Sequence, residues 1–312
     1  MSTVIKIGVV GAGVFGSYHA AKYAARDDAA LTAVFDLDGE NAVALAAKHG
    51  AEAISDFRRF LDKVDAVVIA APASAHFQIA EAALKAGRHV FVEKPLALTL
   101  ASADALIALA DEKKCVLQVG HQERYVCEAV GLLSRDRSPL RAECVRRVPF
   151  SGRCDDVSVA FDLMVHDLDI VRQLTKSDAA NIRADGGKDE IAAELFLENG
   201  TLAVFNAGRR AKESERRMTL IYDDGVIEFD FIRRRLKNST AARLDDVFAP
   251  GAAPLAVRDP LAHGAELFIE AVRGGETPVV SGRSARTAVA WAHDIEQAAG
   301  IETASSVKRL RA

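Results

Sequence analysis

The amino-acid sequence predicts an α/β chain with two parts. The first is a doubly wound parallel sheet, and the second is an α+β domain with an open, mostly antiparallel sheet. As far as His121, six apolar strand-like runs alternate with helix-like stretches, which is typical of a parallel sheet covered by helices. Beyond His121, strand-like runs are joined by Asn-Gly and Asp-Gly turns, which favour antiparallel hairpins. We therefore expect two domains, residues 1–121 and 122–312.

The first strand leads into a glycine-rich loop. Residues 4–10 form a β-prone run, GAGVFG follows at residues 11–16, and a helix is expected over about 17–26. The first glycine permits a tight turn, the second lets a pyrophosphate approach the backbone, and the third lets helix and strand pack closely. Helix N–H groups then hold the phosphates. We therefore expect a dinucleotide to bind at Gly11, Gly13, Val14, Phe15 and Gly16.

The second strand, residues 31–35, ends in Asp36. A carboxylate at this place can accept hydrogen bonds from ribose hydroxyls and would repel a 2′-phosphate. No Lys or Arg follows within the next ten residues, so NAD is favoured over NADP. Asp38 is expected to cap the next helix, residues 39–49, and Gly50 to end it.

Two later strand ends in this domain carry candidate cofactor contacts. After the fourth strand (residues 66–70), Ala71 and Pro72 suit a loop beneath an adenine or nicotinamide ring, and His76 is expected to line the site. The fifth strand, residues 89–92, runs into Glu93 and Lys94 before a proline that stops the sheet. An isolated Glu-Lys pair is usually a surface ion pair. Here it stands at the carboxyl end of a core strand, where open α/β sheets hold ligands, so we expect both residues at the cofactor. The remaining predicted elements are strands 51–54 and 116–120 and helices 56–62, 76–87 and 100–113.

The second domain contains a candidate acid–base pair. Asp162 and His166 are four residues apart on a predicted helix, 157–174, so they share a face, and Asp169 lies three residues further on. A carboxylate one turn away orients an imidazole and raises its basicity, as a base that oxidises an alcohol requires. The alternatives are a surface pair or a metal site, but no third convergent ligand is apparent, so we expect no metal. The other predicted elements are helices 122–134, 261–273 and 284–299 and strands 141–148, 191–197, 202–207, 218–222 and 226–232, with 238–260 as a loop.

Composition limits the class of protein. The 312 residues are 50% hydrophobic and 27% charged, which is typical of a globular protein. The net charge of -4 argues against a nucleic-acid partner, since nucleic-acid-binding proteins usually carry a basic surface. No run approaches the ~20 apolar residues of a membrane span, and no secretory pattern is present, so we expect a cytoplasmic protein. The four cysteines lack C-x-x-C spacing and are expected to be free thiols.

The loop at residues 11–16, the triplet Glu93-Lys94-Pro95 and the pair Asp162-x-x-x-His166 resemble the glucose–fructose oxidoreductase / inositol dehydrogenase (Gfo/Idh/MocA) family over nearly the whole chain. This resemblance implies an NAD-dependent oxidoreductase with a Rossmann domain and an open-sheet domain. It also implies a homodimer or homotetramer formed through the second sheet. By the same resemblance, Lys94 is the active-site lysine, and Asp162 and His166 match the family's acidic and histidine positions.

Residues 119–125 (VGHQERY) and 162–169 (DLMVHDLD) resemble bacterial members of the family that oxidise the 3-hydroxyl of UDP-N-acetylglucosamine or related nucleotide sugars. The resemblance implies hydride transfer from a secondary hydroxyl to the nicotinamide. Lys94 hydrogen-bonds the reacting oxygen, His166 takes the proton, and Asp162 orients the imidazole or a substrate hydroxyl. Lys94 as the base is a second assignment. The residues implied at the substrate are Lys94, Arg124, Tyr125, Asp162 and His166.

A local excess of positive charge favours a nucleotide sugar. Residues 205–237 hold nine basic residues and six acidic ones in a chain that is acidic overall, and Arg is suited to a diphosphate. The simpler interpretation is that most of these side chains are solvated or lie in a subunit interface. Other functions stay open: a simple-sugar or inositol dehydrogenase, an NAD-binding sensor without turnover, or an NAD-dependent glycosidase.

Overall fold

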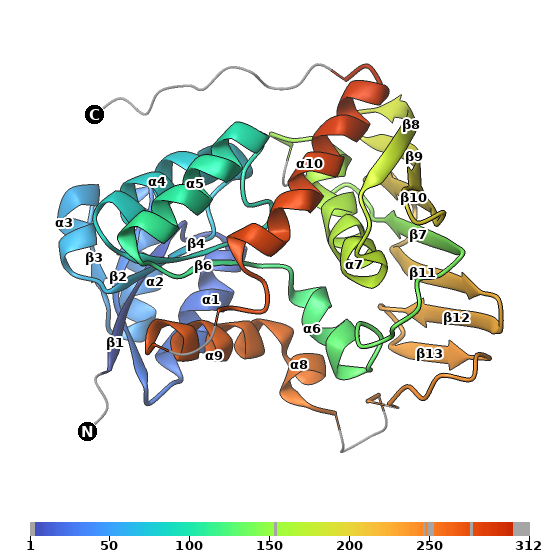
Figure 1. Cartoon of the computed structure of the whole chain (residues 1–312). Helices are drawn as coiled ribbons and strands as arrows, with labels where there is room; N and C mark the ends of the chain where they lie inside the picture. The colour runs from blue at the N-terminus through green and yellow to red at the C-terminus, as the bar shows by residue number, and fades with distance from the viewer. Residues whose placement is uncertain (1–3, 153–154, 246, 249–252, 275–276, 302–312) are drawn as a thin grey trace. The chain divides into compact units, whose positions relative to one another are not determined.

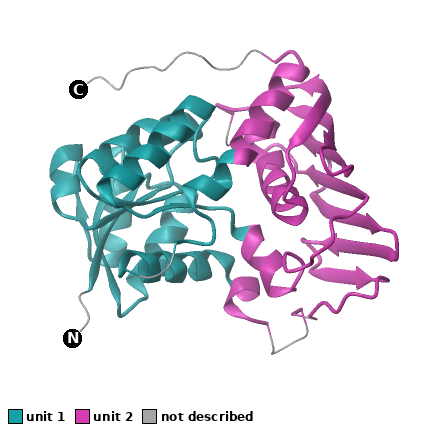
Figure 2. Ribbon diagram, in the orientation of Figure 1, with its two compact units in different colours: residues 1–122, 259–286 teal, residues 123–258, 287–312 magenta. Residues whose placement is uncertain are grey.

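The computed structural model describes residues 4–152, 155–245, 247–248, 253–274 and 277–301. The chain packs into two compact units (Figure 2). Unit 1 contains Met1–Gln122 and Asp259–Arg286, and unit 2 contains Glu123–Arg258 and Thr287–Ala312. The sequence analysis divides the chain once, after residue 121, whereas here residues 259–286 join the first unit. The reason is helix α9 (Pro260–Val272), whose Phe268 and Ile269 share a core with Ile7 and Val9 of the first strand.

Unit 1 is built on a six-stranded parallel sheet with strand order β3-β2-β1-β4-β5-β6. Because β1 lies between β2 and β4, the chain winds outward from it in both directions, which confirms the predicted doubly wound sheet. The loops after β1 and β4 therefore lie next to each other at the carboxyl ends of the strands. The strands are β1 Ile5–Val10, β2 Ala29–Phe35, β3 Glu52–Ala53, β4 Ala66–Ile69, β5 His89–Val92 and β6 Leu117–Val119.

Helices cover both faces of this sheet (Figure 1). Helices α4 and α5 pack together over one face, and α1 contacts α2 and α9 over the other. As predicted, Asp38 caps α2 through the N–H groups of Glu40 and Asn41, and Gly50 ends it at φ 69°. The helices are α1 Val14–Ala24, α2 Gly39–His49, α3 Phe57–Asp62, α4 His76–Lys85 after a 3₁₀ turn at Ala73–Ala75, and α5 Leu100–Lys113.

Unit 2 is built on a seven-stranded sheet with order β13-β12-β11-β7-β10-β9-β8, in which only the β7–β10 pair is parallel. This confirms the predicted open, mostly antiparallel sheet. Its strands are β7 Arg141–Arg147, β8 Ala179–Gly187, β9 Glu190–Leu197, β10 Leu202–Gly208, β11 Glu215–Tyr222, β12 Gly225–Asp230 and β13 Arg235–Asn238.

Several elements of the C-terminal half differ from the sequence prediction. The two edge strands, β8 and β13, were not predicted, because their polar residues interrupt any apolar run. The helix α8 (Leu255–Arg258) was not predicted either, because four residues are too few to show a helical period. Helix α6 (Gln122–Ala129) ends earlier than expected. The helix predicted from residue 157 begins with a π-helical turn, Ala160–Met164, and continues as α7 (Val165–Thr175). Helix α10 (Gly282–Ala298) closes the described chain, within which no helix is long and apolar enough to cross a membrane.

Candidate active site

The loop after β1 has the geometry that a dinucleotide requires. Gly11 has a φ of 95°, and a Cβ there would meet the backbone of Ala70 at 2.7 Å, so only glycine fits beside the end of β4. A Cβ on Gly16 would lie 1.7 Å from the carbonyl oxygen of Gly11. A Cβ on Gly13 would meet no atom within 4 Å, which leaves its backbone open to a pyrophosphate. Gly13 is also the extended N-cap residue, so α1 begins at Val14 and not at Ser17.

Asp36 is fixed against this loop. Its Oδ2 accepts a hydrogen bond from the N–H of Ala12 at 2.5 Å, and its Oδ1 accepts one from the N–H of Asp38 at 2.8 Å. Each carboxylate oxygen has two lone pairs, so both can still accept from ribose hydroxyls. The residues around the loop therefore fit NAD, which supplies a hydride acceptor when it is bound.

His76 lies at the ends of β4 and β5, but its ring is turned into the protein. It is 1% exposed, with Nδ1 2.7 Å from the carbonyl oxygen of Pro95 and Nε2 3.0 Å from that of Ala71. Burial lowers the pKa of His76, and a neutral imidazole carries one N–H, which donates to one of these carbonyls at a time. The ring thus joins the loop after β4 to the loop after β5. Pro72, in the first of these loops, is exposed. Contact of Ala71, Pro72 and His76 with the cofactor stays a prediction.

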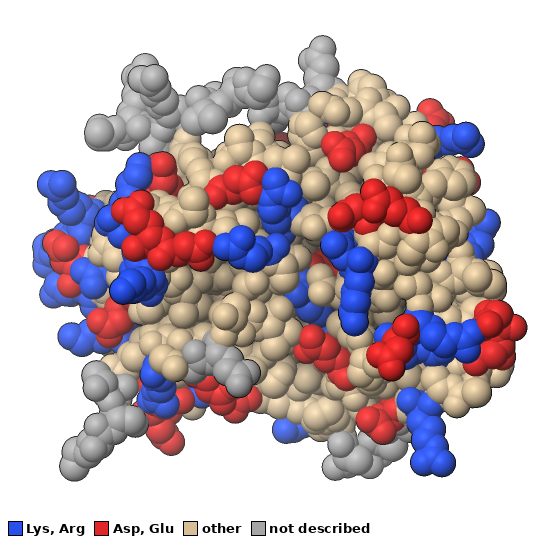
Figure 3. All heavy atoms as spheres, viewed as in Figure 1, with Lys and Arg blue, Asp and Glu red and all other residues tan. Residues whose placement is uncertain are grey.

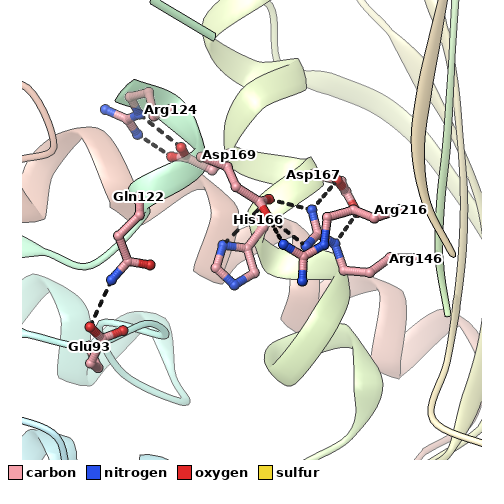
Figure 4. A network of polar contacts seen from close by, with 9 residues as sticks. Glu93, Gln122, Arg124, Arg146, His166, Asp167, Asp169 and Arg216 are labelled. Carbon is pink, nitrogen blue, oxygen red and sulfur yellow. Dashed lines mark hydrogen bonds and ion pairs between the residues drawn. The ribbon is translucent and has the colours of Figure 1, made fainter. Parts of the chain in front are cut away.

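The two charged residues after β5 have different surroundings. Glu93 is 6% exposed, and its Oε1 lies 2.7 Å from Nε2 of His19. The same oxygen lies 2.8 Å from Nε2 of Gln122 (Figure 4). Burial on its own would raise the pKa of Glu93, but the hydrogen bond from His19 and the charge of Lys94 hold it below its usual value. Lys94 is only half-buried. Glu93 therefore ties β5 to α1 and to Gln122 within unit 1, and Lys94 is the residue of the pair with access to ligands.

Asp162 and His166 lie on either side of the change from π- to α-helix. Asp162 belongs to the π-helical turn, and His166 is the second residue of α7. Both side chains are half-buried, whereas neighbouring residues such as Met164 and Val165 are buried. The pair thus occupies the accessible side of this segment. Asp169, which the sequence analysis placed near them, is 1% exposed and pairs with Arg124.

A buried ion cluster lies beside His166 (Figure 4). Arg146, 1% exposed, makes two hydrogen bonds to Asp167, at 2.8 and 2.7 Å, and two to Glu123, at 3.1 and 2.5 Å. Arg216 donates to the same Glu123 at 2.5 Å. Oε2 of Glu123 is 3.9 Å from Nδ1 of His166. The sequence analysis missed this cluster, because its members come from α6, α7, β7 and β11.

Arg124 and Tyr125, the other residues implied at the substrate, are both 1% exposed. Nε of Arg124 donates to Asp169 at 2.8 Å, and Nη2 donates to the second carboxylate oxygen. This two-point pair joins α6 to α7 within unit 2. Direct contact of either side chain with a substrate stays a prediction.

Most of the basic residues between 205 and 237 have a carboxylate partner in their own unit. Six of the nine do: Arg209, Arg210, Arg216, Arg217, Arg233 and Lys237. A hollow of about 290 Å³ in this region is lined by three arginines and also by three carboxylates, Glu213, Glu215 and Asp230. Acidic and basic side chains also lie side by side over the face drawn in Figure 3. Much of the positive charge is therefore neutralised locally.

The cysteines described, Cys115, Cys127 and Cys144, are free, and Cys154 lies outside the described residues. Within the described ranges, no group of three or more His, Cys, Asp or Glu side chains is arranged to hold a metal ion.

The parallel sheet, the glycine loop and the strand-end carboxylate define the class of protein as an NAD-binding oxidoreductase. Residues 5–121 match the model of the Gfo/Idh/MocA family, described as "Oxidoreductase family, NAD-binding Rossmann fold". The chain is 36% identical to UDP-N-acetylglucosamine 3-dehydrogenase of Acidithiobacillus ferrooxidans, over 94% of this chain and 97% of that enzyme. The chain belongs to this family.

Two further comparisons cover nearly the whole chain. A solved structure of UDP-N-acetylglucosamine 3-dehydrogenase from A. ferrooxidans has a TM-score of 0.85 and 35% identity, covering 95% of this chain and 98% of that one. Myo-inositol 2-dehydrogenase of Thermotoga maritima is 28% identical over 97% of this chain and 98% of the relative. These findings confirm the predicted fold, the family, the oxidoreductase class and NAD as the cofactor.

Proposed function

We propose that this protein oxidises a secondary hydroxyl of a nucleotide sugar, such as the 3-hydroxyl of UDP-N-acetylglucosamine, and transfers the hydride to NAD. The observation that carries this proposal is the similarity to UDP-N-acetylglucosamine 3-dehydrogenase, which extends through both units at 36% identity. The likeness therefore includes unit 2, to which this proposal assigns substrate binding. The inositol enzyme of T. maritima matches over a similar length at only 28% identity.

In this proposal each half of the reaction has its own residues. Gly11, Gly13, Val14, Phe15, Gly16 and Asp36 hold the cofactor, and Glu93 fixes the strand end that carries Lys94. Lys94 donates a hydrogen bond to the reacting oxygen and stabilises the negative charge that develops on it. His166 accepts the hydroxyl proton as the C–H bond gives up its hydride. Asp162 orients a substrate hydroxyl or the imidazole, and Arg124 and Tyr125 support the substrate side of α6.

The test is reduction of NAD by individual sugars, followed by absorbance at the reduced-nicotinamide band. We expect turnover with UDP-N-acetylglucosamine and little with free glucose, N-acetylglucosamine or myo-inositol. The matched control is UDP alone, which should bind without reducing NAD. Equal rates with the free sugars would contradict the nucleotide requirement. NAD binding without turnover on any sugar would instead support the alternative function of an NAD-binding sensor.

One observation favours a second candidate, a simple-sugar or inositol dehydrogenase. Six of the nine basic residues between 205 and 237, of which only one or two were expected to reach a diphosphate, are paired with carboxylates. A substrate without phosphates would need none of them. The same assay separates the candidates, since this one requires turnover with free myo-inositol or a free sugar.

We also propose that the protein acts in the cytoplasm as a homodimer or homotetramer. Free thiols at Cys115, Cys127 and Cys144 suit a reducing compartment. Helices pack on one face of the second sheet (Figure 1). The opposite face presents half-buried apolar side chains, among them Val145, Val204 and Ile221, which supports its use as a contact between copies.

A further inference from the structure

One carboxylate beside the imidazole of His166 comes from another helix and belongs to Glu123. Oε2 of Glu123 lies 3.9 Å from Nδ1 of His166, and each side chain is 13% exposed. That distance is too long for a hydrogen bond but short enough for an ion pair. Catalytic hydrogen bonds are often long without substrate and tighten in the complex. The sequence analysis gave the orienting role to Asp162, because a helix places residues four apart on one face.

Glu123 is also held in the ionised form. Burial alone would raise the pKa of Glu123, but Arg146, His166 and Arg216 together hold it well below its usual range. Arg146 and Arg216 lie directly opposite each other on β7 and β11, so two positive charges face this carboxylate across one strand pair. Arg146 shares its charge with Asp167 through two further hydrogen bonds. The cluster thus contains two guanidinium groups and two carboxylates, whose charges cancel.

We propose that Glu123 is a positioning residue for His166, and that Arg216 limits its effect. In this arrangement Glu123 faces Nδ1 and favours the tautomer with its proton there, which assigns proton transfer to Nε2. When Nε2 takes the hydroxyl proton, the new positive charge on the ring is stabilised by Glu123. Arg216 opposes that stabilisation, because it holds a positive charge on the same carboxylate. This inference rests on the proposed function, in which His166 is the base.

The two residues should therefore change the basicity of His166 in opposite directions. The charged groups of the cluster beside the ring are Glu123 from α6, Arg146 from β7, Arg216 from β11 and Asp167 from α7. Asp162 stands four residues before His166 in the same helical segment. Glu123→Gln removes a negative charge beside the imidazole, so the pKa of His166 should fall. Arg216→Gln removes a positive charge and leaves Glu123 in place, so the pKa of His166 should rise. A merely structural role predicts neither sign.

The experiment is an NMR titration of the Cε1–H signal of His166 in the NAD-saturated enzyme, assigned by its loss in His166→Gln. We expect the pKa of His166 to fall by about 1 in Glu123→Gln and to rise by a similar amount in Arg216→Gln. The acid limb of the kcat–pH profile should move in the same direction as each pKa. Arg217→Gln is the matched control. It removes the same charge from the next residue of β11, whose side chain is 61% exposed and pairs with Glu215, so the pKa of His166 should not move.

Unchanged pKa values in both variants, or shifts of the same sign, would overturn the proposal. If Glu123→Gln fails to fold, the half-exposed Arg216→Gln still tests the predicted rise. The titration needs no turnover, so its result is independent of the proposed activity. If the protein oxidises no sugar but the pKa of His166 shifts in opposite directions in the two variants, the proposed function is wrong and the Glu123–His166 coupling stands. Normal sugar oxidation without the shifts in the pKa of His166 would keep the proposed function and overturn the Glu123–His166 coupling.

Discussion

At the scale of single residues, the chain places neighbouring charged groups in different environments. Glu93 is buried by its contacts with His19 and Gln122, and the next residue, Lys94, stays accessible. The same contrast holds between Asp167, which is 3% exposed, and its neighbour His166. In both places a buried carboxylate fixes the backbone next to a residue that is proposed to act on substrate. This arrangement holds the reactive group in position while leaving it open to ligands.

These assignments predict that Lys94→Ala and His166→Ala lower kcat without preventing NAD binding. We expect each to reduce kcat on the order of 10²-fold or more, because each group is assigned to the transition state. Affinity for NAD should stay within a few-fold, since neither residue belongs to the glycine loop or to Asp36. Steady-state kinetics and a fluorescence titration with NAD measure the two effects. The control is His49→Ala, which removes a histidine of α2. Wild-type turnover in His166→Ala would show that His166 has a structural role and is not the base.

At the scale of elements, Glu93 joins three parts of unit 1. It follows β5, accepts from His19 of α1 and contacts Gln122, the first residue of α6. Gly120 makes room for it, because a Cβ at Gly120 would lie 2.7 Å from a carboxylate oxygen of Glu93. The pKa of Glu93 is lowered in the fold, so the carboxylate stabilises the packing of these elements most strongly in its ionised form.

This contribution should depend on pH. The pKa of Glu93 is lowered in the folded state, so its stabilisation is complete above the pKa of an exposed glutamate, about 4.3. It is lost as the pH falls through the lower folded-state value. We expect Glu93→Gln to cost about 1–3 kcal/mol of unfolding free energy at neutral pH, and the difference from wild type to shrink towards pH 3. Urea unfolding across that range measures it, and a difference that stays constant with pH would contradict the account. Asp38→Asn, which keeps a good helix cap, serves as the control.

Local sequence patterns predicted most of the helices and strands, and the features that they missed depend largely on contacts between residues far apart in the chain. The first sheet follows from apolar runs separated by turns, and Gly11–Gly16 and Asp36 follow from the spacing of one βα unit. Edge strands β8 and β13 lack such runs, since edges are commonly polar. No sequence pattern reports that Arg146 and Arg216 would meet Glu123, because the three residues lie far apart in the chain. The membership of α9 in unit 1 depends on a similar distant contact, between Phe268 and Phe91.

At the scale of the whole molecule, the open face of the second sheet is the surface through which we propose that copies assemble. Alternate residues of β7, β10 and β11 are buried on the helix side, and the intervening ones are partly exposed. Val204 lies in the middle of this open face, opposite Glu143 on β7 and Glu194 on β9. A lysine at this position would find two carboxylates across the strands, so a single chain should tolerate it. Between two packed copies the same charge would be buried at the interface.

We therefore predict that Val204→Lys converts the proposed dimer or tetramer into a smaller species while the fold is retained. Sedimentation velocity gives the mass in solution, and circular dichroism with an NAD titration checks the fold and the cofactor site. Val43→Lys, an equal change at an exposed position of α2 in unit 1, should leave the assembly intact. An oligomer that persists unchanged in Val204→Lys would place the contact on another surface. A wild-type chain that sediments as a monomer at all concentrations would remove the assembly altogether.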